Sequence, residues 1–265
     1  MTRRHLFCSA APLLATFVLV APAMAQAEAP PAAQSWVSEV VVTGARGAFT
    51  APTATTATRT PTPIEEVPQS IQALTRTFIE EQDLQSVSDA LSNISGVAPS
   101  RTREIVLQSP KVRGFDASYY IDGLPAYGLP SGVVDPGTLV NVERVEVAKG
   151  PTSTLYGGGT GAPLSGLINL VSRDPEVTPG LEFGVRAGSF NTWGGDLNAS
   201  MPANSGAIRL GLSGSYEAAD SFIRAIDSKR YAFYPTAVLA LGADTNLVLR
   251  GQITRIEQQE YAGLP

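Results

Sequence analysis

The side chains best suited to nucleophilic or metal chemistry lie only at the start of the chain. Cys8 and His5 are the sole cysteine and histidine among its 265 residues. Residues 1–25 have the pattern of a secretory signal peptide, whose removal leaves no thiol and no imidazole. Disulfides, cysteine or histidine zinc sites, haem ligation and Ser/His or Cys/His catalysis are therefore excluded in the remaining residues.

Three successive features carry the signal-peptide prediction. Arg3 and Arg4 form a positive start, an apolar run follows over residues 13–21, and Ala23 and Ala25 frame a small-residue cleavage site before Gln26. The apolar run is too short to be a membrane-spanning helix.

The carboxylates and glycines of the mature part do not suggest a catalytic centre either. Glu143 and Glu146 are three residues apart in an expected strand, so their side chains point to opposite faces and do not converge. The glycines at 157–161 lack the Gly-Lys-Ser/Thr ending of a nucleotide loop. We expect Lys149 and Tyr156 to be structural and the protein not to be an enzyme.

The composition excludes some partners and suits an outer-membrane β protein. The formal net charge is −5 and no basic patch dominates, so nucleic acid is not an expected partner. Charged residues make up 16% of the chain, below the usual quarter of soluble domains, and 25 residues are glycine. Transmembrane β-barrels have such a composition, because their moderate hydropathy is spread over alternating strands and is not concentrated in one span.

Residues 26–63 are rich in Ala, Pro and Thr and read as a flexible segment. One island, EVVVTG at residues 39–44, has three consecutive β-branched residues. Such an island can add a strand to the sheet edge of a partner. The residues alone also allow the first strand of the following domain, or a sticky patch in a linker.

Residues 64–100 read as a strand followed by two helices. Residues 69–75 fit a short strand. Thr75 or Thr77 can cap the next helix, and Thr77 with Glu80 fits a capping box. Ser86 with Asp89 opens a second helix, which Gly96 ends. Its apolar face comprises Val87, Ala90, Leu91 and Ile94.

Strands and glycine-rich turns follow. Asp122-Gly123 is a hairpin-turn dipeptide, residues 141–149 form an expected strand, and GLINL at residues 166–170 completes the domain.

The sequence VEVAKGPTSTLYG at residues 145–157 resembles the RVEV-x-RGP-x-S-x-LYG signature of the plug domain of TonB-dependent outer-membrane receptors. Residues 68–97 resemble the first half of that plug. KVRGF at 111–115 and YYIDGLP at 119–125 match its IRGF and YVDG patterns. Within the family the chain looks most like the ferric-siderophore receptors, although the receptors for haem, cobalamin or carbohydrate remain an alternative.

Beyond residue 180 the pattern changes to period two, with an apolar face opposite a polar face. It predicts five strands, in residues 181–187, 192–201, 208–217, 231–241 and 246–255. The alternation alone suits either a soluble β-sandwich or a transmembrane barrel, and the signal peptide and the plug resemblance favour the barrel. The connections near residues 204 and 243 are short and the one at 218–229 is long, as periplasmic turns and external loops are.

The predicted fold class is therefore an α+β plug domain followed by the start of an antiparallel transmembrane β-barrel. The expected divisions are a signal peptide at 1–25, a flexible segment at 26–63, the plug at 64–175 and barrel strands from 181 to 265. Plugged barrels of this class use about 22 strands, which need at least roughly 330 residues. We therefore expect a fragment or truncated product that is not transport-competent alone.

The resemblance also implies partners and a site. It implies strand addition to the energy-coupling protein TonB by Glu39, Val40, Val41, Val42 and Thr43. It implies a ferric siderophore as ligand and the outer membrane of a Gram-negative bacterium, with its lipid, as location. Iron would arrive already chelated, so no cofactor of the protein's own is expected. By their position relative to the matching motifs, Arg101, Arg103 and Tyr127 are the expected ligand contacts.

Two other classes fit less well. A periplasmic binding or signalling module would leave the five strands without a purpose. A secreted hydrolase would need converging carboxylates, which Glu143 and Glu146 do not supply.

Overall fold

The computed structural model describes residues 49–99, 109–126, 138–152, 165–223, 226–242 and 245–259. All of these residues belong to one compact unit, residues 45–265. The predicted signal peptide and the predicted TonB-binding strand lie outside the described residues. Among the described residues, no helix has the length and apolar character needed to cross a membrane.

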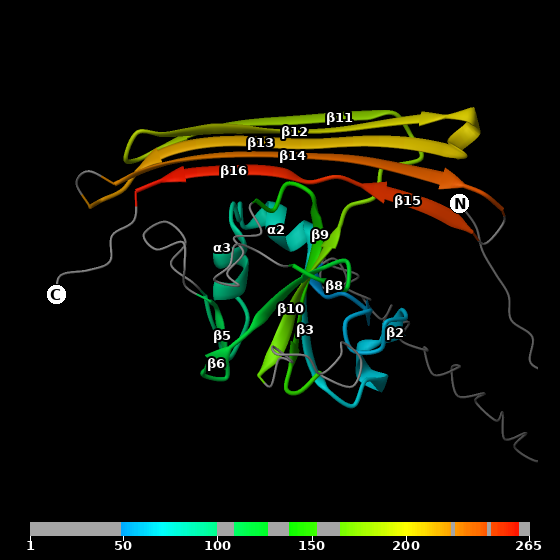
Figure 1. The fold of residues 1–265 in the computed structure, drawn as a ribbon, viewed down its shortest axis with the longest axis horizontal. Helices are drawn as coiled ribbons and strands as arrows, with labels where there is room; N and C mark the ends of the chain where they lie inside the picture. Colours follow the sequence, from blue (N-terminus) through cyan, green and yellow to red (C-terminus); the bar gives the residue numbers. More distant parts are fainter. Residues whose placement is uncertain are drawn as a thin grey trace, which may run out of the picture. The chain divides into compact units, whose positions relative to one another are not determined.

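A five-stranded sheet forms the centre of the plug region (Figure 1). Its strand order is β3-β9-β10-β7-β8. The bounds are Ser70–Thr75 for β3, Val142–Lys149 for β9, Gly166–Ser172 for β10, Ser118–Ile121 for β7 and Leu124–Pro125 for β8. β10 and β7 are parallel and the other pairs antiparallel. The predicted turn joins β7 to β8, with Asp122 and Gly123 at positive φ of 50° and 77°, as a type I′ hairpin requires.

Two short helices pack against this sheet. α2 spans Arg76–Glu81 and begins at Thr75, whose hydroxyl accepts from Phe78 N. The predicted capping box of Thr77 and Glu80 is wrong, because Thr77 already lies inside the helix. The cap at Thr75 is favoured because β3 ends there and leaves its backbone extended, as an N-cap requires.

The second helix, α3 (Val87–Ser92), has the predicted capping box, with Ser86 and Asp89 bonding reciprocally. The helix ends at Ser92, before the predicted stop at Gly96, which lies at φ +70° in the following turn. The predicted apolar face is buried in the main core with strand residues of β9 and β10. Its members are Val87, Ala90, Leu91 and Ile94.

Two small sheets flank the plug sheet. β1 (Thr53–Ala54) pairs with β2 (Thr62–Pro63), followed by the 3-10 helix η1 (Ile64–Glu66). The other small sheet has the order β4-β5-β6. Its bounds are Val97–Ala98, Lys111–Val112 and Phe115–Asp116.

From Gly180 onward the chain forms a curved antiparallel sheet, called the wall sheet here (Figure 1). Its strands are β11 (Gly180–Gly188), β12 (Thr192–Ala203), β13 (Ile208–Asp220), β14 (Asp227–Ala240), β15 (Asn246–Arg250) and β16 (Ile253–Gln258), with η2 (Asn204–Gly206) between β12 and β13. We predicted five strands here and the structure has six segments. The fifth predicted strand is divided into β15 and β16 by a gap at Gly251 and Gln252. Both segments pair with β14, and the register is the same on the two sides of the gap.

Pro235 of β14 explains the interruption. It stands opposite the gap, its carbonyl accepts from Gly251 N at 2.9 Å, and it has no N–H to return the bond. Its missing donor removes one step of the ladder without shifting the register.

The two faces of the wall sheet differ as the alternation predicts. One face exposes large apolar side chains: Leu181, Phe183, Val185, Trp193, Leu197, Met201, Leu210, Phe233, Leu247 and Leu249. The other face buries polar side chains: Asn198, Ser213, Ser228, Arg230 and Thr236. The inner face is not wholly polar, since Ala232 and Tyr234 pack against Val140 of the plug region.

Candidate functional site

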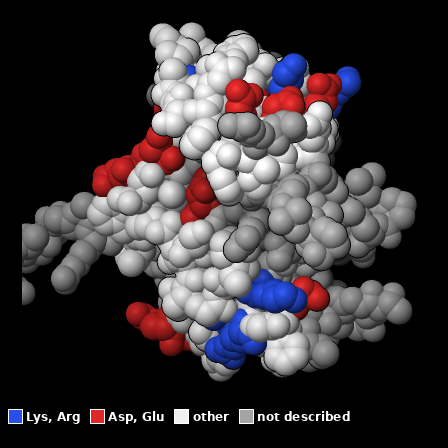
Figure 2. Space-filling model, turned by 90° about the vertical axis from the view of Figure 1, so that its left-hand side faces the viewer, with Lys and Arg blue, Asp and Glu red and all other residues white. Residues whose placement is uncertain are grey.

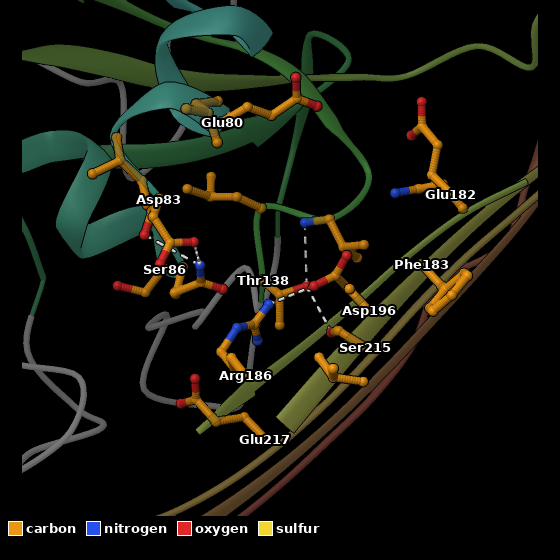
Figure 3. Close-up of a pocket in the computed structure, with 18 of the residues that line it drawn as sticks. Glu80, Asp83, Ser86, Thr138, Glu182, Phe183, Arg186, Asp196, Ser215 and Glu217 are labelled. Atoms are coloured by element: carbon orange, nitrogen blue, oxygen red, sulfur yellow. Dashed lines mark hydrogen bonds and ion pairs between the residues drawn. The ribbon is translucent and has the colours of Figure 1, made fainter. Parts of the chain in front are cut away.

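A cavity of about 500 Å³ lies between the plug helices and the inner face of the wall sheet (Figure 3). The plug side contributes α2, the loop after it and the segment before β9. Residues lining it from this side include Arg76, Glu80, Asp83, Gln85, Ser86 and Thr138. The wall side contributes Glu182, Arg186, Asp196, Asn198, Ser215, Glu217 and Arg230. Apolar residues also line it, Ile79, Leu84, Leu139 and Val140 from the plug side and Phe183 and Val185 from the wall side, so the lining mixes charged, polar and apolar groups.

Hydrogen bonds fix the cavity walls. Arg186 Nη2 lies 2.6 Å from Asp196 Oδ1 on the neighbouring strand. Ser215 Oγ lies 3.0 Å from Thr138 Oγ1 and joins the wall directly to the plug (Figure 3). On the plug side, Arg76 Nη1 donates to Leu139 O at 2.7 Å, which ties α2 to the chain entering β9. The side chains around the cavity are therefore held in place by bonds within and between the two sheets.

Arg173 forms ion pairs at the junction between the plug region and the wall sheet. Its guanidinium donates to Glu182 Oε2 at 2.9 Å and to Glu176 Oε1 at 3.0 Å. The hydrogen bond to Glu182 is the main cause that raises the pKa of Arg173, with further contributions from the charges of both glutamates against the opposing effect of burial. The segment leaving β10 is thus fixed to the first wall strand.

Lys149, at the end of β9, has the structural role that we predicted. Its Nζ donates to Gln72 Oε1 and to Ser95 Oγ, so it joins β3 to the turn after α3. Burial lowers its pKa, and the charge of Arg113 lowers it further. The family signature has Arg at this position, and a lysine carries a single compact charge in place of a planar guanidinium.

Glu146 was missed as a functional candidate. Sequence reasoning placed Glu143 and Glu146 on opposite faces of one strand, and the structure leaves Glu143 half-buried while Glu146 is fully buried. Its carboxylate receives bonds from Thr55, Thr56 and Arg144. The sequence did contain a signal for this role, a glutamate between two valines of a strand expected to be buried. A buried carboxylate needs several hydrogen-bond partners, so such a position predicts a polar network.

The predicted TonB-binding residues Glu39, Val40, Val41, Val42 and Thr43 lie outside the described part of the chain, and so do the predicted ligand contacts Arg101, Arg103 and Tyr127. These assignments stay predictions. Asp116, the last residue of β6, pairs with Lys111 at 2.9 Å on the surface. No group of three or more acidic, cysteine or histidine side chains among the described residues could hold a metal ion.

Charge on the surface is mixed. Figure 2 shows one face of the molecule, where acidic and basic side chains lie in small groups separated by uncharged surface.

An aromatic row crosses the exposed face of the wall sheet. The rings of Trp193 and Tyr216 have centroids 4.7 Å apart, and those of Tyr216 and Tyr231 are 5.0 Å apart. The three come from adjacent strands. Aromatic rows of this kind mark the membrane–water boundary of transmembrane barrels.

Residues 63–163 match the TonB-dependent Receptor Plug Domain family. The Ferrioxamine B receptor of Salmonella typhimurium (strain SL1344) is 33% identical over 228 residues, which cover 82% of this chain and 32% of that protein. The Ferrichrome outer membrane transporter/phage receptor of Escherichia coli (strain K12) is 30% identical, covering 78% of this chain and 28% of that protein. Residues 63–163 therefore carry a plug domain of the TonB-dependent receptor family.

Solved receptor structures agree with this assignment. The pyoverdine outer membrane receptor FpvA from Pseudomonas aeruginosa PAO1 superposes with a TM-score of 0.70 at 26% identity, covering 79% of this chain and 31% of that one. The alcaligin outer membrane receptor FauA from Bordetella pertussis gives 0.68 at 26% identity, covering 80% and 36%. The predicted family and fold class are confirmed. The number of strands in a whole barrel and the domain limits stay predictions.

The chain spans about a third of the length of the curated relatives that it matches. Those relatives are receptors and transporters by name.

Proposed function

We propose that the chain belongs to an outer-membrane receptor of a Gram-negative bacterium that takes up ferric siderophores and is energised through TonB. The observation that carries this proposal is the combination of a plug region with a wall sheet, shared over most of the chain with receptors for ferrioxamine B, ferrichrome and pyoverdine. The transport relatives also favour a protein that is not an enzyme.

The outward face of β14 approaches the height of the apolar band of an outer-membrane barrel. Tyr231 and Leu239 face outward in β14 and are separated by about 26 Å along the strand. A barrel tilt of about 40° turns this separation into about 20 Å of height, close to the roughly 25 Å apolar band of such barrels. The exposed apolar face would then contact lipid while the polar face contacts the plug.

Iron enters this account as cargo. A chelated ferric ion has its ligands already, so the receptor needs no cofactor and no metal-coordinating side chains of its own. Recognition would depend on arginine hydrogen bonds and aromatic surfaces, and Arg101, Arg103 and Tyr127 remain the proposed contacts. The work would come from TonB, bound by strand addition to residues 39–43.

The test is uptake of ⁵⁵Fe by cells that express the whole receptor carrying this chain, offered hydroxamate, catecholate and mixed-ligand siderophores one at a time. We expect uptake of at least one ferric siderophore, lost in a strain without TonB. Uptake of haem, cobalamin or an oligosaccharide in place of every siderophore would overturn the ligand class. Uptake that does not depend on TonB would overturn the energising partner.

A further inference from the structure

The N-terminal part of the plug region is attached to its sheet by one buried carboxylate. Residues 53–63, called the strap here, comprise β1, β2 and the turn between them, drawn in blue in Figure 1. Glu146 Oε2 accepts from two consecutive backbone amides of the strap, Thr55 N at 3.0 Å and Thr56 N at 2.9 Å. The hydroxyl of Thr56 donates to the same oxygen. The hydroxyl of Thr55 also lies 3.5 Å from it, so four donors of one short segment converge on a single atom.

The carboxylate is itself held firmly. Glu146 is fully buried in β9, and its other oxygen accepts from Arg144 Nε at 2.5 Å. Asn169 of β10 donates to Thr56 Oγ1 at 3.0 Å and accepts from Gly123 N at 2.9 Å. The network therefore connects the strap to β9, to β10 and to the turn between β7 and β8.

Apolar packing contributes little to the same attachment. The buried residues of the strap are Ala54, Thr56 and Ala57, all small. The remaining strap bonds are largely internal, such as that between Thr58 Oγ1 and Thr62 Oγ1 at 2.8 Å. Small side chains bury little apolar area, whereas hydrogen bonds to a charged, desolvated acceptor are the strong ones. The polar network around Glu146 is therefore the main interaction that holds the strap to the plug sheet.

We propose that Glu146 is the latch that holds the strap to the plug sheet, and that a pull on the N-terminal tail is resisted at this latch. This inference rests on the proposed function, in which TonB pulls on residues 39–43. Along the described chain a pull first reaches Phe49, whose ring makes an edge contact with Phe78 at 6.0 Å. It then reaches Thr55 and Thr56. Release of residues 53–69 would lengthen the free chain by up to about 60 Å while β3 stays paired to β9.

The test uses the whole receptor in lipid nanodiscs, without ligand or TonB. Glu146→Gln keeps the shape but places an amide among donors. Thr56→Val removes only the hydroxyl. Glu143→Gln makes the same charge change on the opposite face of β9 and is the matched control. Amide exchange of residues 55 and 56 and the force of the first rupture are measured, the latter by pulling on the N-terminus in an atomic force microscope.

We expect exchange at residues 55 and 56 to rise at least 10-fold in Glu146→Gln and less in Thr56→Val, with a lower first rupture force in both. Glu143→Gln should match the wild type, and strands β9 and β10 should stay protected in all variants. Unchanged exchange and force in Glu146→Gln, or equal changes in Glu143→Gln, would overturn the latch. Neither readout requires transport, so failure of siderophore uptake would refute the proposed function alone.

Discussion

Arg250 Nη2 of the wall sheet lies 2.5 Å from Asp174 Oδ1, in the segment that leaves the plug sheet. Its other terminal nitrogen lies 3.6 Å from Asp122 Oδ2, at the turn between β7 and β8. Asp122 in turn accepts from Ser172 N and Ser172 Oγ at the end of β10. One arginine therefore connects β15 to two separate parts of the plug region. Arg250 and Asp174 are 76 residues apart in the sequence.

Replacing this arginine should have a small effect. Arg250→Met removes two ion pairs that are partly solvent-exposed, and such pairs contribute about 1 kcal/mol or less. We expect the unfolding free energy to fall by no more than that, with a loss that shrinks at high salt. Arg255→Met, which breaks an exposed pair with Glu257, is the control with a still smaller effect. A loss of several kcal/mol on denaturant unfolding would mean that the pairs are effectively buried.

Removing the Glu146 carboxylate should lower the free energy of unfolding far more than removing Arg250. Glu146→Ala leaves the amides of Thr55 and Thr56 without their acceptor and Arg144 without its partner, and it opens a small cavity. Breaking a buried, hydrogen-bonded charge pair costs about 3–5 kcal/mol. We expect a loss of that order for the plug region in denaturant unfolding, against less than about 1 kcal/mol for Glu143→Ala. Equal losses would show that the two positions are equivalent.

Replacing Pro235 should increase the stability of the wall sheet. Pro235→Val supplies the missing N–H opposite Gly251, and valine favours strands. We expect β15 and β16 to join, with slow amide exchange at residue 235, whose new N–H can donate to the Gly251 carbonyl, and a raised thermal midpoint of the wall sheet. Ala237→Val adds bulk on the same face without a new donor and serves as the control. Fast exchange at residue 235 would contradict the explanation of the gap.

The predicted TonB strand has its own test. Val41→Pro removes one backbone donor from the segment that adds to the partner's sheet, whereas Val41→Ala keeps it. We expect Val41→Pro to abolish energised uptake and leave surface binding of ligand intact, with Val41→Ala only mildly impaired. Normal uptake by the proline variant in whole cells would remove the assignment.

Local signals predicted most of the elements. Ser86 and Asp89 marked the start of α3, and the alternation around Trp193 and Leu197 marked both the strands and their outward face. These signals succeed because they depend on near neighbours in the chain: a cap needs residues three apart and a strand face needs every second one.

Long-range features were not predictable in the same way. The choice of Thr75 over Thr77 as the cap depends on where β3 stops pairing with β9. The latch at Glu146 joins residues 90 apart in sequence, and the parallel pairing of β10 with β7 connects distant segments. In each case tertiary partners decide between alternatives that the local sequence leaves equal.

The most direct test of the account is whether Trp193 faces lipid. The chain has two tryptophans, so the whole receptor would carry Trp36→Phe, with any tryptophan outside these 265 residues also replaced. Trp193 fluorescence is then measured in vesicles with and without brominated acyl chains. We predict strong quenching by bromine placed near the membrane boundary and weaker quenching by bromine at the centre. A fluorescence that bromine does not quench at any depth, from a tryptophan shielded in a water-soluble fold, would contradict the claim that the wall sheet spans an outer membrane.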